Sequence, residues 1–208
     1  MTLTFLHTSD AQRPTYQALG DRLAPGMEIT QHLRPDWLKS ARKHGIRQAL
    51  IDDMAALIHA APGPVICTCP TLGEAAASLG AIRLDAPMMA EAARIGGPIL
   101  LVYALKSTET PSLALLDTAL QARDLKTPVH PLFIGEFWPL FEAHEYEAFT
   151  ACVAGAVRHA CEQTTFGCVV LAQDVMAPAA PLLQDLGTPV LTAPELAFTH
   201  AMAQLTQT

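Results

Sequence analysis

The stretch that decides the fold is Val65-Ile66-Cys67-Thr68-Cys69-Pro70-Thr71-Leu72-Gly73-Glu74. Its first residues are apolar and partly β-branched, which is typical of a buried strand. Pro70 follows at a place where proline commonly opens a helix, because the first helical residue needs no N–H donor. A strand that runs into a helix in this way is half of a βαβ unit. The stretch therefore predicts an α/β protein with a parallel sheet.

The same alternation extends over the whole chain of 208 residues. Short, continuous apolar runs predict strands that are covered on both faces, and the Ala-rich stretches between them predict helices. The expected strands are 3–7, 64–67, 82–84, 98–104, 129–134, 168–172 and 189–191. The expected helices are 36–60, 71–79, 87–95, 112–122, 142–162 and 194–205. We therefore predict parallel sheets flanked by helices.

A weak internal repeat divides the chain into two halves. Leu84–Ala90 matches Leu191–Ala197 at Leu, Ala, Pro and Ala, and each copy follows a unit that ends in Leu-Gly. We therefore expect two pseudo-symmetric α/β lobes, the first formed by residues 1–96 and 188–208 and the second by residues 97–187. Because ligands bind beyond the carboxyl ends of parallel strands, we expect the active site in a cleft between the lobes.

The composition argues against several kinds of partner. A net charge of −7 disfavours a nucleic-acid or anionic-membrane surface. No apolar run is long enough to span a bilayer, and we expect no signal peptide. The five cysteines stand scattered in apolar surroundings, which favours reduced thiols in the cytoplasm. Glycine-rich nucleotide motifs and metal-ligand spacings are missing from the sequence, so we expect no cofactor and no metal.

Cys69 is the strongest candidate for a reactive residue. A thiol at the start of a helix lies near the positive end of the helix dipole and near unpaired N–H groups, both of which favour the thiolate. Thr71 offers a hydroxyl at the same helix end. Cys67 lies within the strand, and we interpret it as a small buried hydrophobe. The same structural role is the alternative for Cys69.

Polar side chains also follow the first strand. His7, Thr8 and Ser9 stand where the rim of a ligand site would begin. His7 is a candidate base or orienting group for Cys69, and the alternative is a histidine that only holds a loop in place. In the second half, residues 106–110 form a hydroxyl-rich turn that suits a carboxylate. The alternative is that these residues are an N-cap cluster before a helix that begins near residue 112.

The aromatic run Phe137–Phe141 is a separate feature of the second half. We interpret it as core packing. A cover over the cleft and the contact surface of a homodimer are the alternatives.

These motifs resemble the aspartate/glutamate racemase superfamily, which includes hydantoin racemases, maleate isomerases and arylmalonate decarboxylase. Cys69-Pro70-Thr71 stands where that family has Cys-Asn-Thr after an apolar strand. Thr108 stands where a threonine binds the substrate carboxylate, and Leu171-Ala172-Gln173-Asp174 stands where the family has Leu-Gly-Cys-Thr. The resemblance implies a cofactor-independent site between two lobes. In such a site one thiolate removes an α-proton and a second thiol protonates the opposite face.

The chain departs from this pattern at Gln173, because an amide cannot replace the second cysteine as a proton shuttle. Asp174 is a candidate helper on that side. The aspartate that the family has near its first cysteine would fall at about His7 or Thr8. We therefore expect an enzyme that uses Cys69 alone on a small carboxylate-bearing substrate, as an isomerase, a decarboxylase or a nucleophilic catalyst. The alternative is a non-catalytic carboxylate-binding protein. The expected substrate-binding residues are Thr8, Ser9, Pro70, Thr71, Thr108 and Gln173.

Overall fold

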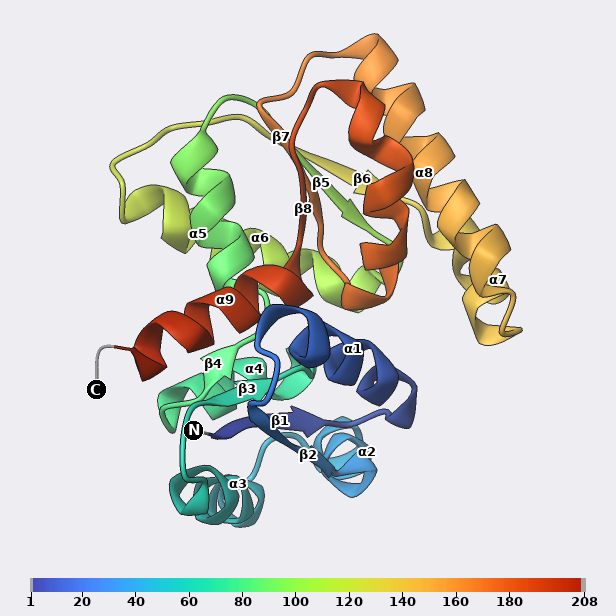
Figure 1. Cartoon of the computed structure of the whole chain (residues 1–208). Coiled ribbons are helices and arrows are strands. Elements are labelled where there is room, and N and C mark those ends of the chain that lie inside the picture. Colours follow the sequence, from blue (N-terminus) through green and yellow to red (C-terminus); the bar gives the residue numbers. More distant parts are fainter. Residues whose placement is uncertain (1, 207–208) are drawn as a thin grey trace. The chain divides into compact units, whose positions relative to one another are not determined.

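The continuous apolar runs of the sequence form the strands of two fully parallel sheets, each with four strands (Figure 1). The computed structural model describes residues 2–206. Two compact units divide the chain: unit 1 comprises residues 1–85 and 194–208, and unit 2 comprises residues 86–193. Helices flank both sheets, which confirms the predicted α/β fold.

Unit 1 is built on a sheet with the order β2-β1-β3-β4. Its strands are β1 (Thr2–His7), β2 (Glu28–Leu33), β3 (Val65–Cys67) and β4 (Ile82–Arg83). Its helices are η1 (Asp10–Gln12, a 3-10 helix), α1 (Arg13–Leu23), α2 (Pro35–His44), α3 (Gln48–Ala60), α4 (Pro70–Ser78) and α9 (Ala193–Leu205).

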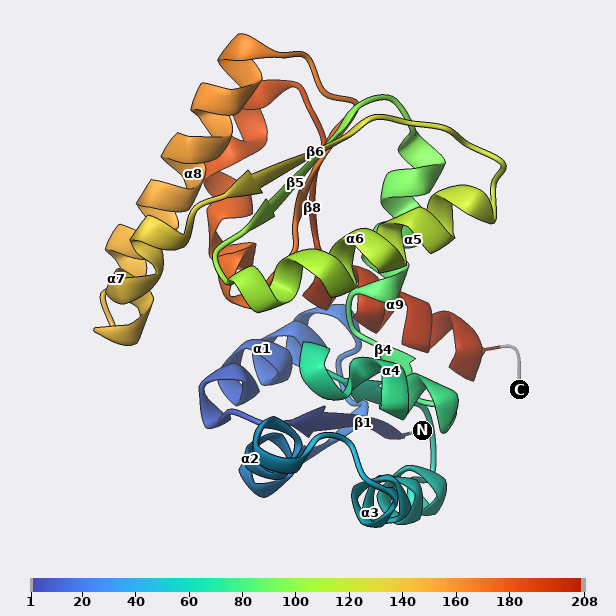
Figure 2. The same ribbon diagram turned by 180° about the vertical axis from the view of Figure 1, so that it is seen from behind.

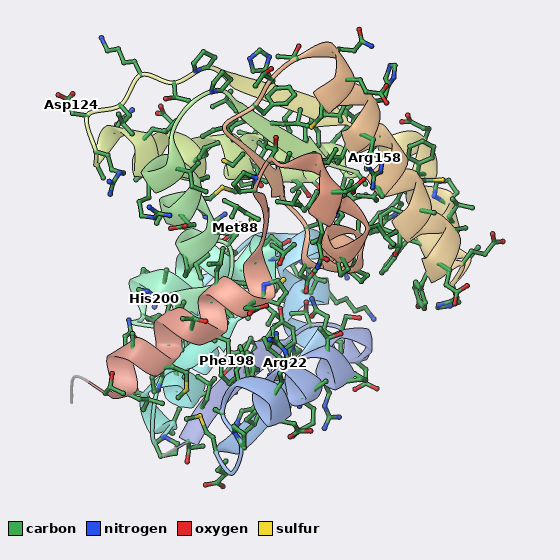
Figure 3. The ribbon with its side chains drawn as sticks, turned by 45° about the horizontal axis from the view of Figure 1, so that its top comes forward. Arg22, Met88, Asp124, Arg158, Phe198 and His200 are labelled. Carbon is green, nitrogen blue, oxygen red and sulfur yellow. The ribbon has the colours of Figure 1, made fainter. Side chains whose placement is uncertain are left out.

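Alternation along β1 directs its side chains into two separate layers of unit 1. Phe5 faces α1 and α9, with its ring 4.7 Å from that of Tyr16 and 6.3 Å from that of Phe198. Figure 3 labels Phe198 beside Arg22 of α1, and the Arg22 side chain pairs with Glu195 of α9. On the opposite face, side chains of β1 and β3 pack with α2, α3 and α4 in one apolar cluster. The sheet is therefore covered on both faces, as parallel sheets require.

Unit 2 has the corresponding sheet order, β6-β5-β7-β8. Its strands are β5 (Ile99–Tyr103), β6 (Val129–Phe133), β7 (Cys168–Leu171) and β8 (Val190–Thr192). Its helices are α5 (Ala86–Ile95), α6 (Lys106–Gln121), η2 (Gly135–Phe137), α7 (Trp138–Glu142), α8 (Tyr146–Gln163) and η3 (Asp174–Leu186). The elements η2 and η3 are 3-10 helices.

The sheet of unit 2 is also enclosed between helices. Leu100, Val102 and Val169 pack with apolar residues of α8 and η3. Helices α5 and α6 lie on the other side of the sheet, as Figure 2 shows. The aromatic run Phe137–Phe141 packs partly buried against this core, which agrees with its interpretation as a packing segment. No helix in the described part of the chain is both long and apolar enough to cross a membrane.

The internal repeat marks equivalent positions in the two halves. Leu84–Ala90 leads from β4 into α5, and Leu191–Ala197 leads from β8 into α9. Helix α5 follows β4 of unit 1 but belongs to unit 2, where it packs on β7 and β8. Helix α9 follows β8 of unit 2 but belongs to unit 1, where the ring of Phe198 lies beside that of Phe5. The unit boundaries consequently fall at 85/86 and 193/194. From the sequence we expected these boundaries at 96/97 and 187/188. They differ because α5 and β8, which we expected in the first lobe, both belong to unit 2.

Several elements differ from those expected. Strand β2 was not predicted, because it is a half-exposed edge strand without a continuous apolar run. The expected helix 36–60 is two helices, α2 and α3, interrupted at Gly45 with φ +74°. The expected helix 142–162 begins later, at Tyr146 of α8, because α7 ends at Glu142 and His144, with φ +62°, lies between the two helices. Helix α6 begins at Lys106 rather than near residue 112, since the hydroxyl-rich segment and Pro111 form its first turns.

A buried ion pair joins the last strand of unit 1 to the chain that follows it. Arg83 donates from Nε and Nη2 to the two carboxylate oxygens of Asp85, at 2.7 and 2.9 Å. Both side chains are largely buried, with exposed fractions of 12% and 10%. The stem of Arg83 lies over Gly73 of α4, where a Cβ atom would come within 3.0 Å of Arg83 Cγ. This pair therefore fixes β4 against α4.

We predict that Arg83→Met lowers the free energy of unfolding by about 3–5 kcal/mol, because it leaves the Asp85 carboxylate buried without its cation. Urea unfolding followed by circular dichroism measures the change. Arg94→Met is the matched control. It removes the exposed pair of Arg94 with Glu91 and should cost far less, because water screens that pair. Equal losses in the two variants would contradict the prediction.

Candidate functional site

The predicted site residues lie at the carboxyl ends of two pairs of neighbouring strands. In unit 1, β1 pairs with β3 in parallel, with Leu6 opposite Cys67. In unit 2, β5 pairs with β7 in parallel, with Val102 opposite Leu171. The residues that follow neighbouring parallel strands share one edge of the sheet. The unit 1 edge carries His7, Thr8, Ser9, Cys69, Pro70 and Thr71, and the unit 2 edge carries Thr108, Gln173 and Asp174.

Cys69 is the N-cap residue of α4, with an extended backbone, and Pro70 is the first helical residue. This placement agrees with the strand-to-helix junction expected from the sequence. The Cys69 side chain is only 4% exposed and packs in the apolar cluster that includes Leu6, Trp37 and Leu72. Pro70 and Thr71 are exposed at the same helix end. The thiol thus lies under the rim of the sheet, with polar and exposed groups next to it.

Cys67 plays a different part from Cys69. Its Sγ donates a hydrogen bond to the backbone oxygen of Cys69 at 3.7 Å. Burial raises the pKa of the Cys67 thiol to about 12, so that this group stays protonated at neutral pH. Cys67 therefore has the structural role that its place within the strand suggested, and it supports the backbone from which Cys69 projects.

His7 is completely buried, and its two ring nitrogens lie next to partners other than Cys69. Nδ1 is 3.0 Å from the hydroxyl of Thr68, and Nε2 is 3.0 Å from Oε1 of Gln31. The ring stacks 5.8 Å from that of Phe5. Both ring nitrogens thus face groups other than the Cys69 thiol that we expected as the partner of His7. His7 is linked to Cys69 only through Thr68, the residue that precedes Cys69 in the chain.

Thr68 connects three segments through a single hydroxyl group. Its oxygen lies 3.0 Å from His7 Nδ1, 3.2 Å from the carbonyl of Leu6 and 3.1 Å from Oε1 of Gln12. A hydroxyl has one proton to donate and two lone pairs to accept with. If the proton goes to Leu6 or Gln12, His7 Nδ1 is the donor to Thr68. Either way, the hydroxyl joins the end of β1 and η1 to the segment that carries Cys69.

Burial is also the main influence on the charge of His7. It lowers the pKa from the usual 6.5 to about 4, although the hydrogen bond to Gln31 favours the charged form. Nearby Arg13 lowers the pKa further. The imidazole is therefore neutral at physiological pH, and it acts as a fixed hydrogen-bonding group rather than as a proton donor.

In unit 2, Gln173 holds the turn between β5 and α6. Its Oε1 accepts hydrogen bonds from the backbone N–H groups of Ala104 at 2.7 Å and Leu105 at 3.3 Å. Gln173 is the N-cap residue of η3, and its backbone oxygen accepts from the N–H of Met176. Gln173, which the resemblance places at the second family cysteine, is therefore held by the backbone that directly follows a neighbouring strand.

The other predicted residues occupy less enclosed positions. Thr8 is half-buried and Ser9 is exposed just before η1. Thr108 is buried in the first turn of α6 rather than in a separate turn, and its N–H donates to the carbonyl of Leu105. Asp174 is half-buried at the first position of η3. Within residues 2–206, no group of three or more His, Cys, Asp or Glu side chains is placed to hold a metal ion.

Sequence reasoning missed the residues that support the site. Thr68, Gln12 and Gln31 carry no motif of their own. Trp37 is a further case, because its Nε1 is buried next to the Cys69 cluster and has no hydrogen-bond partner in the described chain. The one feature of the sequence that could have predicted a role for Thr68 is its position between two cysteines at the end of a strand.

We predict that the free energy of unfolding falls as the pH decreases from about 6.5 towards 4. In this window the unfolded chain binds a proton at His7 that the folded chain does not, so the loss is on the order of 3 kcal/mol. Below pH 4 this contribution is exhausted. His7→Gln should remove that part of the pH dependence, which urea titrations at several pH values measure. The same acid sensitivity in both proteins would count against a neutral buried His7.

No family model matches the sequence, and no curated protein matches it either. Solved structures do match over nearly the whole chain. An allantoin racemase from Pseudomonas fluorescens superposes with a TM-score of 0.67 at 15% identity, covering 100% of this chain and 92% of that one. An aspartate racemase homologue from Pyrococcus horikoshii has a TM-score of 0.68 at 12% identity, with 99% of each chain covered.

A variant of arylmalonate decarboxylase, solved with sulfate, has a TM-score of 0.58 at 14% identity, and the match covers 98% of this chain and 92% of that one. Racemases and a decarboxylase thus share this arrangement of strands and helices. At such low identity the likeness concerns the fold. The chain therefore shares the fold of these racemases and of the decarboxylase, as the resemblance of its sequence motifs had led us to expect.

Proposed function

We propose that the chain is a cofactor-independent enzyme that uses Cys69 on a small carboxylate-bearing substrate. The observation that carries this proposal is the position of Cys69 as the N-cap of α4, immediately beyond a central parallel strand. Ligands of parallel α/β proteins bind at this edge, and a helix start favours the thiolate. The names of two structural neighbours, an aspartate racemase homologue and an arylmalonate decarboxylase, support chemistry at a carbon next to a carboxylate.

In the proposed reaction, Cys69 exchanges one proton with the substrate carbon. As a thiolate, it removes the α-proton and leaves an enolate-like anion. In a decarboxylation, the bond to the departing CO2 breaks first, and the Cys69 thiol then delivers its proton to the resulting carbanion. Hydroxyls of Thr8, Ser9 and Thr71 and the N–H groups at the start of α4 would stabilise the substrate oxygens. The five free thiols support a reducing compartment such as the cytoplasm.

A single cysteine limits the stereochemical outcome. Racemisation needs a proton donor on each face of the planar intermediate. Gln173 stands in place of the second cysteine, and an amide has no proton to exchange at neutral pH. The proposed enzyme therefore adds and removes protons on one face only.

One observation favours the alternative of a binding protein without catalysis. The Cys69 side chain is 4% exposed and lies in an apolar cluster, which is the usual setting of an inert structural cysteine. A carboxylate ligand could then bind at the helix ends without reaction.

We predict that iodoacetamide labels Cys69 faster than Cys152 and Cys161 at neutral pH, although those two thiols are more exposed. The reason is that reactivity follows thiolate content and not exposure alone. Peptide mass spectrometry after timed quenching measures each rate. Labelling that simply follows exposure, with Cys152 and Cys161 first, would favour the binding protein.

We also predict that a true substrate exchanges its α-hydrogen for solvent deuterium while it keeps its configuration. Nuclear magnetic resonance in D2O, with malonates, other dicarboxylates, amino acids and hydantoins, identifies the substrate. Cys69→Ser should abolish exchange, whereas the matched Cys67→Ser should retain exchange and mainly lose stability. Racemisation at the rate of exchange would overturn the single-base mechanism.

A further inference from the structure

Among the outer strands of the two described sheets, three carry a feature that discourages pairing with another chain. Strands β4 and β8 are short, with two and three residues. Strand β6 is longer, but Pro131 stands at its centre. The N–H of Ile134 bonds to β5, so His130 and Leu132 also face β5 and Pro131 faces the free edge. Proline has no N–H, so this edge lacks a donor at its middle.

Strand β2, at the outer edge of the unit 1 sheet, has neither protection. It is six residues long and contains no proline. The N–H of Arg34 bonds to the carbonyl of His7 in β1, so the backbone groups of Ile29, Gln31 and Leu33 face the free edge. Within residues 2–206, no other segment bonds to these outward groups. A row of unpaired backbone groups on a long outer strand is a template for a further strand.

The sequence of β2 complements itself when a second copy lies antiparallel to it. A two-fold axis at Gln31 brings the outward backbone groups of the two strands face to face, which antiparallel hydrogen bonding requires. It also places Ile29 opposite Leu33, an apolar pair that occurs twice. An axis at Leu33 would instead bring Pro35, which has no N–H, opposite Gln31. The pattern of the strand therefore favours the axis at Gln31.

The same register joins opposite charges. Glu28 lies opposite Arg34 of the second copy, at a position where cross-strand side chains come closest. Glu28 is exposed and accepts a hydrogen bond only from the Thr2 hydroxyl among the described residues. Arg34 uses Nε and Nη2 in its pair with Asp36, which leaves Nη1 for a second carboxylate. Each end of the paired strands therefore has one acid facing one base.

We propose that β2 is the contact strand of a homodimer, in which two copies of the chain join their unit 1 sheets edge to edge about a two-fold axis at Gln31. Such an interface is isologous, so every favourable pair occurs twice. It uses residues of unit 1 alone and does not depend on the chemistry proposed for Cys69. It also differs from the run Phe137–Phe141, which packs on the core of unit 2.

Sedimentation velocity over a series of protein concentrations tests the proposal on the full chain, which should form a dimer. Amide deuterium exchange in the peptide 28–34 should slow as the dimer forms, because the outward N–H groups become bonded. A chain that stays monomeric throughout the series would overturn the proposal, even if β2 accepts a strand of another protein. A dimer in which exchange of this peptide does not change with concentration would overturn it as well.

Glu28→Arg places like charges opposite each other at both ends of the paired strands. We expect it to raise the dissociation constant of the dimer by about 10- to 100-fold. Glu147→Arg makes the same change of charge at an exposed site on α8 and should leave the dimer unchanged. Gln31 is kept in all variants because its side chain contacts His7. Equal dissociation constants for the two variants would place the interface elsewhere and overturn the proposal.

A mixture of two variants tests the register itself. Arg34→Glu should also weaken its own dimer, since it faces Glu28 of the second copy. Mixed with Glu28→Arg in equal amounts, it should form a heterodimer, because both ends of the paired strands then carry opposite charges again. Two well-folded variants that each lose the dimer and remain monomeric when mixed would overturn the register at Gln31. If circular dichroism shows that Arg34→Glu does not fold, the comparison of Glu28→Arg with Glu147→Arg decides the proposal.

Discussion

The parallel pairing of β1 with β3, and of β5 with β7, determines where every candidate functional side chain lies. Parallel neighbours must be joined by crossovers, so their carboxyl ends share one edge. At each such edge a strand ends, a polar residue follows and a helix begins. Cys69 before α4 and Gln173 before η3 are two instances of this junction. Cys69 and Gln173 therefore occupy equivalent positions, after the third strand of each unit's sheet order.

The two junctions have different chemical characters. In unit 1, Cys69 directly follows Thr68, whose hydroxyl lies 3.0 Å from the ring of the buried, neutral His7. In unit 2 an amide uses its oxygen to fix the turn after β5, which leaves only its nitrogen for other contacts. A thiol can exchange a proton, whereas an amide whose oxygen is already engaged can only donate hydrogen bonds. This difference between the two junctions is the basis of the proposal that the chain works with one thiol.

The sequence revealed the elements that are apolar throughout and missed those that are not. Strands such as β3, β5 and β7 are buried on both faces, so each reads as an unbroken apolar run. Strand β2 is an edge with polar residues, and its pairing with β1 becomes visible only in three dimensions. Among the site residues, Cys69 and Gln173 stood out because they directly follow strands. The partners of His7 could not be predicted, since Gln31 is 24 residues away and Thr68 is 61 residues away.

Helix α9, the last helix of the chain, packs against β1, the first strand, where Phe198 covers Phe5 together with Tyr16. This has a consequence for synthesis on the ribosome. Unit 2 lies within residues 86–193, so its complete segment leaves the exit tunnel while the unit 1 sheet still lacks one of its covering helices. Domains usually fold in the order in which they emerge. In this chain the sheet that is translated first can receive its covering helix α9 only after all of unit 2 has been translated.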